Sequence, residues 1–154
     1  MAVPASSMLD NLVELSRLMV GVAYRSLDDL GADLDLPSFR ALAYVERDAG
    51  CTMGAFAVGT ALAPSSATRL CNRLVEQGWL IRQNRPANRR QVELSLSSAG
   101  RTLVRAARSA RRAELSVIVA RLPRHRQRLL TDLLPELVAA ASNAEPLGSV
   151  AWAV

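Results

Sequence analysis

Four arginines lie close together in the segment "RQNRPANRR", at positions 82, 85, 89 and 90, and no acidic residue follows them before Glu93. Guanidinium groups bind the oxygens of phosphate or carboxylate groups through paired hydrogen bonds. The segment stands between the apolar "GWLI" and the alternating "VELSL", a pattern typical of a hairpin with a projecting connection. Such a loop can enter the minor groove of DNA, although arginines on loops are often merely solvated.

The positive charge is concentrated in the middle of the chain. Over 154 residues the formal net charge is +5. Residues 51–113 hold eleven arginines and two acidic residues, whereas residues 1–50 hold four arginines and eight acidic residues. A basic segment between acidic and neutral flanks is typical of a protein that binds a polyanion.

Residues suited to catalysis or metal binding are sparse. Cys51 and Cys71 are separated by nineteen residues and His125 is the only histidine, so we expect no disulfide framework and no metal site. We expect Cys71 to be buried and Cys51 to lie on an accessible loop. No nucleophile with a nearby base, phosphate-binding glycine loop or pair of catalytic carboxylates stands out. We therefore expect neither a cofactor nor an enzyme.

The composition indicates a packed, mostly helical protein. Half of the residues are hydrophobic and only 4% are aromatic, which favours a core of Leu, Val and Ala. No apolar run is long enough to span a bilayer, and the first residues do not resemble a secretion signal. We expect a single cytoplasmic domain over residues 1–154.

Apolar positions at helical spacing predict helices at both ends of the chain. Residues 7–30 form the first, with Ser7 and Asp10 as its N-terminal cap, and a partner subunit is one way to cover its large apolar surface. Another helix is predicted from Ser98 to Pro123, and a last helix that kinks or breaks at Pro135. The tail, residues 142–154, either docks on the body or is loose.

The middle of the chain predicts a winged helix-turn-helix. A second helix over 36–50 precedes a short helix over 53–60 and a tight connection over 61–63. The next helix, 64–78, places four apolar residues on one face, with Ser, Thr and Arg on the others. Strands at 79–83 and 91–97 then form a hairpin. The predicted inner face comprises Ala67, Leu70, Cys71 and Leu74.

The polar side of helix 64–78 holds the residues best suited to contact DNA. Ser65 and Ser66 lie at its N-terminus, where free backbone N–H groups suit a phosphate or a base edge. Thr68 and Arg69 follow on the exposed side, where arginine can bind guanine, and Arg73 is expected to meet phosphate. The alternative is an ordinary polar surface. A further arginine stripe on the helix that follows is either solvated or extends the DNA footprint: Arg101, Arg105, Arg108 and Arg112.

This order of elements resembles the MarR family of bacterial transcription regulators. The family's wing signature runs Asp-x-Arg, five residues, Leu-Thr, two residues, Gly. The run here is Asn88-Arg89-Arg90, "QVELS", Leu96-Ser97, "SA", Gly100. Asn88 thus replaces an aspartate and Ser97 a threonine, and Ala61 stands near a position that is usually glycine. The resemblance covers roughly residues 10–140.

The resemblance implies a winged-helix lobe over 36–99, with its wing at 79–98, and dimerisation helices over 7–30 and 100–141. Arg89 would enter the minor groove, and Arg90 would brace the wing. The resemblance further implies a homodimeric repressor on pseudo-palindromic double-stranded DNA, released by a small lipophilic or phenolic effector. The competing hypothesis is an interaction module whose basic surface binds an acidic protein.

Overall fold

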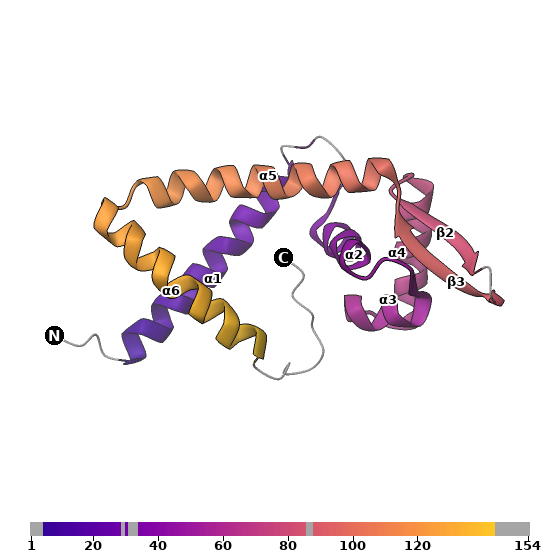
Figure 1. Ribbon diagram of the computed structural model, residues 1–154, viewed down its shortest axis with the longest axis horizontal. Helices are drawn as coiled ribbons and strands as arrows, with labels where there is room; N and C mark the ends of the chain where they lie inside the picture. The colour runs from indigo at the N-terminus through magenta and orange to yellow at the C-terminus, as the bar shows by residue number, and fades with distance from the viewer. Residues whose placement is uncertain (1–4, 29, 31–33, 86–87, 144–154) are drawn as a thin grey trace.

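The molecule is organised around one long helix, α5 (Ser98–Ala120), in a computed structural model (Figure 1). The structure describes residues 5–28, 30, 34–85 and 88–143, with the backbone alone at residues 5, 6, 85, 88–91 and 143. At one end of α5 lies a lobe that contains a small sheet and the helices α2 (Leu36–Arg47), α3 (Met53–Thr60) and α4 (Pro64–Glu76). Toward the other end lie α1 (Ala5–Asp28) and α6 (Arg124–Asn143). The predicted mostly helical winged-helix fold is confirmed.

The wing is a hairpin within a three-stranded antiparallel sheet of order β1-β3-β2. Its strands, β2 (Leu80–Arg85) and β3 (Asn88–Leu96), pair from Leu80 opposite Leu96 to Arg85 opposite Asn88. The strands therefore extend beyond the predicted ranges, and Arg85, Arg89 and Arg90 belong to strands rather than to a loop. Pairing continues past an irregularity at Asn84, where the sequence no longer alternates. The wing tip, residues 86–87, lies outside the described residues.

The third strand, β1 (Cys51–Thr52), was predicted as a loop. It pairs with β3, with Cys51 opposite Leu94. A strand of two residues has no periodicity to detect, and its partner lies more than forty residues further along the chain. The loop expected around Cys51 is therefore wrong.

Polar side chains fix the start of three helices in the lobe. The Asp35 carboxylate accepts the Ser38 N–H at 2.8 Å and caps α2. The Thr52 and Ser97 hydroxyls accept the backbone N–H three residues on, at 3.2 and 2.9 Å, and cap α3 and α5. These bonds satisfy donors that a helix leaves unpaired in its first turn. They set where the helices of the lobe begin.

Two predicted features of the terminal helices are wrong: the N-terminal cap at Ser7 and a break at Pro135. Helix α1 begins at Ala5, so Ser7 lies within the first turns rather than at the cap. Helix α6 continues through Pro135 to Asn143. Proline removes one backbone donor, and the surrounding leucines and Glu136 are good helix formers that sustain the turn around it.

The core lies inside the lobe and extends to the C-terminal end of α1. Its centre consists of side chains that are at most 2% exposed, contributed by α1, α2, α3, α4, β3 and α5: Leu27, Phe39, Leu42, Phe56, Leu74, Leu94 and Val104. Burying one such side chain contributes about 1.5–3 kcal/mol relative to leaving it exposed. This packing joins α3 and α4, the two helices of the helix-turn-helix, to α5 in one core.

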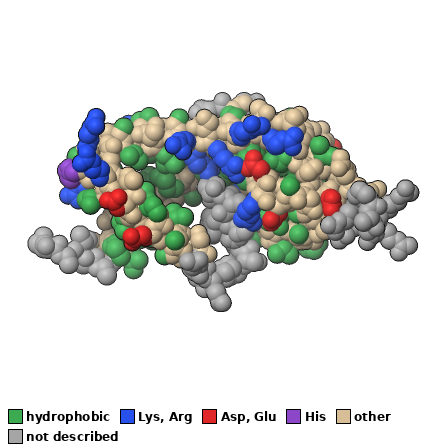
Figure 2. All heavy atoms as spheres, in the orientation of Figure 1, with side chains coloured by type: hydrophobic (Ala, Val, Ile, Leu, Met, Phe, Trp, Pro, Cys, Tyr) green, Lys and Arg blue, Asp and Glu red, His purple; other side chains and the backbone are tan. Residues whose placement is uncertain are grey.

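The other end of the molecule leaves large apolar side chains exposed. Val13 on α1 is 68% exposed and Val138 on α6 is 62% exposed. Figure 2 shows hydrophobic side chains on the α5–α6 side of the molecule. None of the described helices combines the length and apolar character needed to cross a membrane. The exposed residues, here called the α1/α6 apolar surface, are Leu9, Leu12, Val13, Leu15, Leu18, Leu129, Leu133, Leu134, Leu137 and Val138.

Candidate nucleic-acid interface

Helix α4 divides into one buried and one exposed face, as the sequence predicted. The four residues of the predicted inner face, Ala67, Leu70, Cys71 and Leu74, are at most 8% exposed. The opposite side consists of exposed polar residues: Ser65, Thr68, Arg69, Asn72 and Arg73, with Ser66 half-buried. The buried face fixes the helix on the core and leaves its polar side available for recognition.

The N-terminal turn of α4 has no side-chain cap. Ala63 precedes the helix and Pro64 occupies its first turn, so no side chain accepts the first backbone N–H groups. The Thr68 hydroxyl donates to the Pro64 carbonyl at 2.9 Å, and an Arg69 nitrogen donates to the Ser66 hydroxyl at 3.2 Å. An uncapped helix N-terminus attracts an anion, because its N–H groups and the helix dipole favour negative charge.

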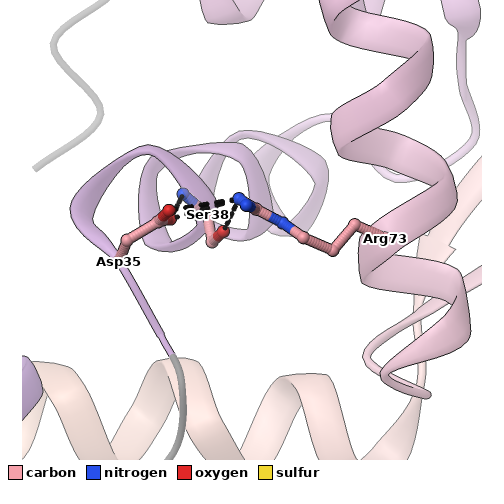
Figure 3. Close-up of polar contacts among 3 residues, drawn as sticks. All are labelled: Asp35, Ser38 and Arg73. Atoms are coloured by element: carbon pink, nitrogen blue, oxygen red, sulfur yellow. Dashed lines mark hydrogen bonds and ion pairs between the residues drawn. The ribbon is translucent and has the colours of Figure 1, made fainter.

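Arg73 differs from Arg69 in having an acidic partner on another helix (Figure 3). Its Nη2 donates to the Ser38 hydroxyl at 2.8 Å and lies 3.2 Å from the nearer oxygen of Asp35. Partial burial disfavours the charged form of Asp35, but hydrogen bonds from Ser38 and the charge of Arg73 outweigh it. The pKa of this carboxyl is therefore lowered. The side chain expected to meet phosphate is already engaged within the protein.

The wing lies beside α4 at the end of the lobe (Figure 1). Arg82 on β2 is exposed. Arg89 and Arg90 lie on β3 near the tip, and their side chains are outside the described residues. Their expected roles in the minor groove and in bracing the wing remain predictions.

The base of the wing is fastened to α5 by residues whose role the sequence did not reveal. The Ser97 hydroxyl donates to the Gly78 carbonyl at 2.6 Å and caps α5 through the Gly100 N–H. A Cβ at Gly100 would lie 2.2 Å from the Trp79 carbonyl oxygen. The spacing from Leu96 to Gly100 therefore has a structural reason. It places the Ser97 cap, and the glycine that lies against the Trp79 backbone, where the wing meets α5.

The arginine stripe on α5 is partly engaged. Arg101 donates to the Leu96 carbonyl at 2.7 Å, and Arg105 to the Arg101 carbonyl at 3.3 Å. Arg108 forms an ion pair with Glu46 on α2 at 2.5 Å, whereas Arg112 is exposed. Arg101 and Arg108 therefore contact the lobe, whereas Arg105 bonds within α5, and the extension of the DNA footprint by this stripe stays a prediction.

Both cysteines are buried. Burial raises the pKa of the Cys51 thiol to about 11, and the nearby charge of Asp48 adds to this effect. Cys51 is therefore not the accessible thiol that the sequence suggested, while the expected burial of Cys71 is confirmed. Within the part of the chain that the structure describes, no group of three potential metal ligands occurs.

Comparison with known proteins identifies the family. The model of the MarR family matches residues 32–91. An uncharacterized HTH-type transcriptional regulator of Mycobacterium bovis is 34% identical over 108 residues, which cover 68% of this chain and 76% of the relative.

Solved structures share the fold. A Mycobacterium tuberculosis protein superposes with a TM-score of 0.80 at 24% identity, covering 95% of this chain and 99% of that one. A mutant of S. aureus MepR bound to an oligodeoxyribonucleotide gives 0.66 at 19% identity, covering 89% and 98%. This chain belongs to the MarR family of helix-turn-helix transcriptional regulators.

Proposed function

We propose that this chain is a homodimeric transcription regulator that binds pseudo-palindromic double-stranded DNA. The observation that carries the proposal is the exposed, uncapped N-terminal turn of α4 beside the wing, in a chain of the MarR family. In a two-fold dimer, recognition helices enter successive major grooves about 10 bp apart, since this is one turn of B-DNA. The oligonucleotide-bound MepR mutant, which has the same fold, supports this use of the surface.

Helix α4 is the proposed reader of the major groove. Ser65 and Ser66 present hydroxyls and backbone N–H groups to a phosphate at the helix N-terminus. The Thr68 oxygen still has a lone pair for a base amine, because its hydrogen is directed at the Pro64 carbonyl. Arg69 reads a base, with guanine favoured because its O6 and N7 accept both arms of a guanidinium.

The wing is the proposed contact with the adjoining minor groove. Arg89 enters the groove, where A·T-rich DNA has a narrow minor groove and a strongly negative potential. Arg90 braces the hairpin. With Asn88 in place of the family's aspartate, the guanidinium has a neutral amide oxygen rather than a carboxylate as its acceptor, so this brace lacks the attraction of an ion pair.

The α1/α6 apolar surface is the proposed dimer interface. The ten leucine and valine side chains that define this surface are exposed in the single chain, several by more than half. Apolar patches of this kind rarely remain open to water in soluble proteins. Two copies that pack these helices together would place the paired α4 helices on one face of the DNA.

We further propose that the regulator is a repressor, released by a small lipophilic or phenolic ligand. Family membership supports this, together with a hollow of about 600 Å³ between α1 and the lobe. Its volume suits a small molecule. One half of its lining is formed by Tyr24, Leu27, Leu34 and Leu36, and the other half by the polar or charged residues Asp28, Asp35, Arg73 and Gln77. A ligand that prefers one spacing of the lobes shifts the dimer toward that state.

The test is DNA binding to fragments of the chain's own promoter region, with competitor DNA and several salt concentrations. The wild type should protect a pseudo-palindrome. Arg69→Ala should lower the preference among base sequences by about 1–3 kcal/mol, because it removes a base contact. Arg89→Ala should weaken binding to all sequences while the dimer persists. It should also reduce by about one the magnitude of the salt slope, which is the slope of log K for DNA binding against log salt concentration.

Arg126→Ala is the matched control, because Arg126 is an exposed arginine at the start of α6, away from the lobe. Its loss should change neither base preference nor slope. Absence of a footprint at any salt concentration, together with capture of an acidic protein through the same arginines, would establish the interaction module instead.

A further inference from the structure

The side chain of Arg73 connects two helices that otherwise meet mainly through their neighbours. Arg73 lies in the last turns of α4 and reaches the N-terminus of α2 (Figure 3). The body of α4 packs chiefly on α3 and on β2. The contact of Arg73 with Asp35 and Ser38 is therefore a direct tie between α4 and α2.

The partners of Arg73 are held firmly in place. Ser38 is 1% exposed, and its hydroxyl accepts the Arg73 hydrogen bond at 2.8 Å. Asp35 is itself fixed, because its carboxylate caps α2 by accepting the Ser38 N–H. A guanidinium bonded to a buried hydroxyl and to a carboxylate that caps α2 constrains the helix that carries it.

The position of this tie relates it to the proposed DNA surface. Arg73 and Asp35 line a hollow of about 370 Å³ together with Ser66 and Arg69. They also line the larger hollow beside α1. The tie thus stands between the residues proposed to read DNA and the junction of the lobe with α1.

We propose that Arg73 is a positioning residue: its bonds to Asp35 and Ser38 act with the buried face of α4 to hold the orientation of the helix, and so help to place Ser66 and Arg69, in preference to a contact with phosphate. This inference rests on the proposed function. An arginine whose charge is already matched by Asp35 displaces few counterions from DNA, so it contributes little to the salt dependence of binding.

The experiment compares Arg73→Gln, Asp35→Asn and the double variant in operator affinity over a series of salt concentrations. Asparagine caps a helix as well as aspartate does, so Asp35→Asn removes the charge while keeping the cap. Each single variant should weaken binding by about fivefold, as expected for a half-exposed ion pair with a hydrogen bond. The double variant, which keeps the wild-type net charge, should be no weaker than either single one, and its salt slope should equal that of the wild type.

A phosphate contact predicts a different pattern. The double variant would then reduce the slope by about one, while Asp35→Asn would leave affinity unchanged or increase it by releasing the guanidinium. Either result overturns the proposal, as does unchanged affinity in both single variants. Arg126→Ala again controls for the loss of one positive charge, and urea unfolding verifies that each variant is folded.

A second readout keeps this inference separate from the proposed function. If the wild type bound no duplex, the proposed function would fail, and the tie would be judged by amide hydrogen exchange of the free protein. Arg73→Gln and Asp35→Asn should both accelerate exchange in α4 relative to Arg126→Ala. Exchange in α4 that stays at the wild-type rate in both variants would refute the tie even where DNA binding is intact.

Discussion

Ala61 adopts a conformation that suits glycine better. It ends α3 in the left-handed region, with φ 55° and ψ 37°, and its N–H bonds to the Ala57 and Val58 carbonyls. A side chain in this region encounters the following carbonyl, whereas glycine has no such contact. The family's usual glycine near this position thus has a direct physical explanation.

Ala61→Gly should stabilise the protein by about 0.5–1 kcal/mol, because relief of the left-handed strain exceeds the added freedom of the unfolded chain. Urea unfolding measures this difference. Ala55→Gly is the control: Ala55 is exposed within α3, where glycine should cost about 1 kcal/mol. Equal destabilisation by the two substitutions would show that Ala61 is not strained.

Individual contacts were the least predictable part of the candidate site. The exposed face of α4 followed from helical periodicity, and it placed Ser65, Thr68 and Arg69 correctly at the surface. The partner of Arg73 could not be predicted from this periodicity, because Asp35 lies 38 residues earlier in the chain and only the packed lobe brings it near. Burial of Cys51 was missed for the same reason, since it depends on pairing with Leu94.

At the scale of elements, the wing meets α5 through a close backbone contact. Trp79 precedes β2, and its carbonyl accepts the Ser97 N–H at 3.0 Å. The same carbonyl oxygen occupies the space where a side chain at Gly100 would lie. The wing and α5 are therefore joined by backbone contact rather than by a flexible linker.

Gly100→Ala should destabilise the protein by about 1–3 kcal/mol, as overpacking of a tight contact does, and should displace the wing from α5. Thermal or urea unfolding measures the first effect. Gly54→Ala is the control, because Gly54 is exposed on α3 with only the Thr52 hydroxyl within 4 Å, at 3.9 Å. There alanine should be neutral or stabilising by up to about 1 kcal/mol. A stable Gly100→Ala protein would contradict the tight joint.

The elements themselves were largely predictable from periodicity and capping residues. The helices of the lobe and both wing strands were anticipated. Helix α4 buries one regular face, and on β3 the apolar residues Leu94 and Leu96 alternate with polar ones. The departures are β1, the outer ends of β2 and β3, and the uninterrupted α6. Each depends on long-range pairing or on local helix propensity near Pro135, which an apolar pattern does not report.

At the scale of the molecule, the α1/α6 apolar surface is the proposed interface with a second copy of the chain. Leu133→Glu should raise the dissociation constant of the dimer at least tenfold, because it places a charge in an apolar interface, and tenfold corresponds to about 1.4 kcal/mol. Sedimentation equilibrium measures the change. Val58→Glu is the control, since Val58 is also an exposed apolar residue, at 64%, but lies on α3 in the lobe. A monomeric wild type, or equal mass for both variants, would exclude this interface.

Helix α5 also acts as a lever. Its 23 residues span about 35 Å, at 1.5 Å per residue. One ion pair, Arg25–Glu114, ties it to α1, and another, Arg108–Glu46, ties it to the lobe. Tilting a rigid rod of that length by about 5° moves its tip by roughly 3 Å, close to the rise of one base pair. In the proposed dimer, a slight change of angle between the two copies would therefore shift each lobe by about one base-pair step along DNA.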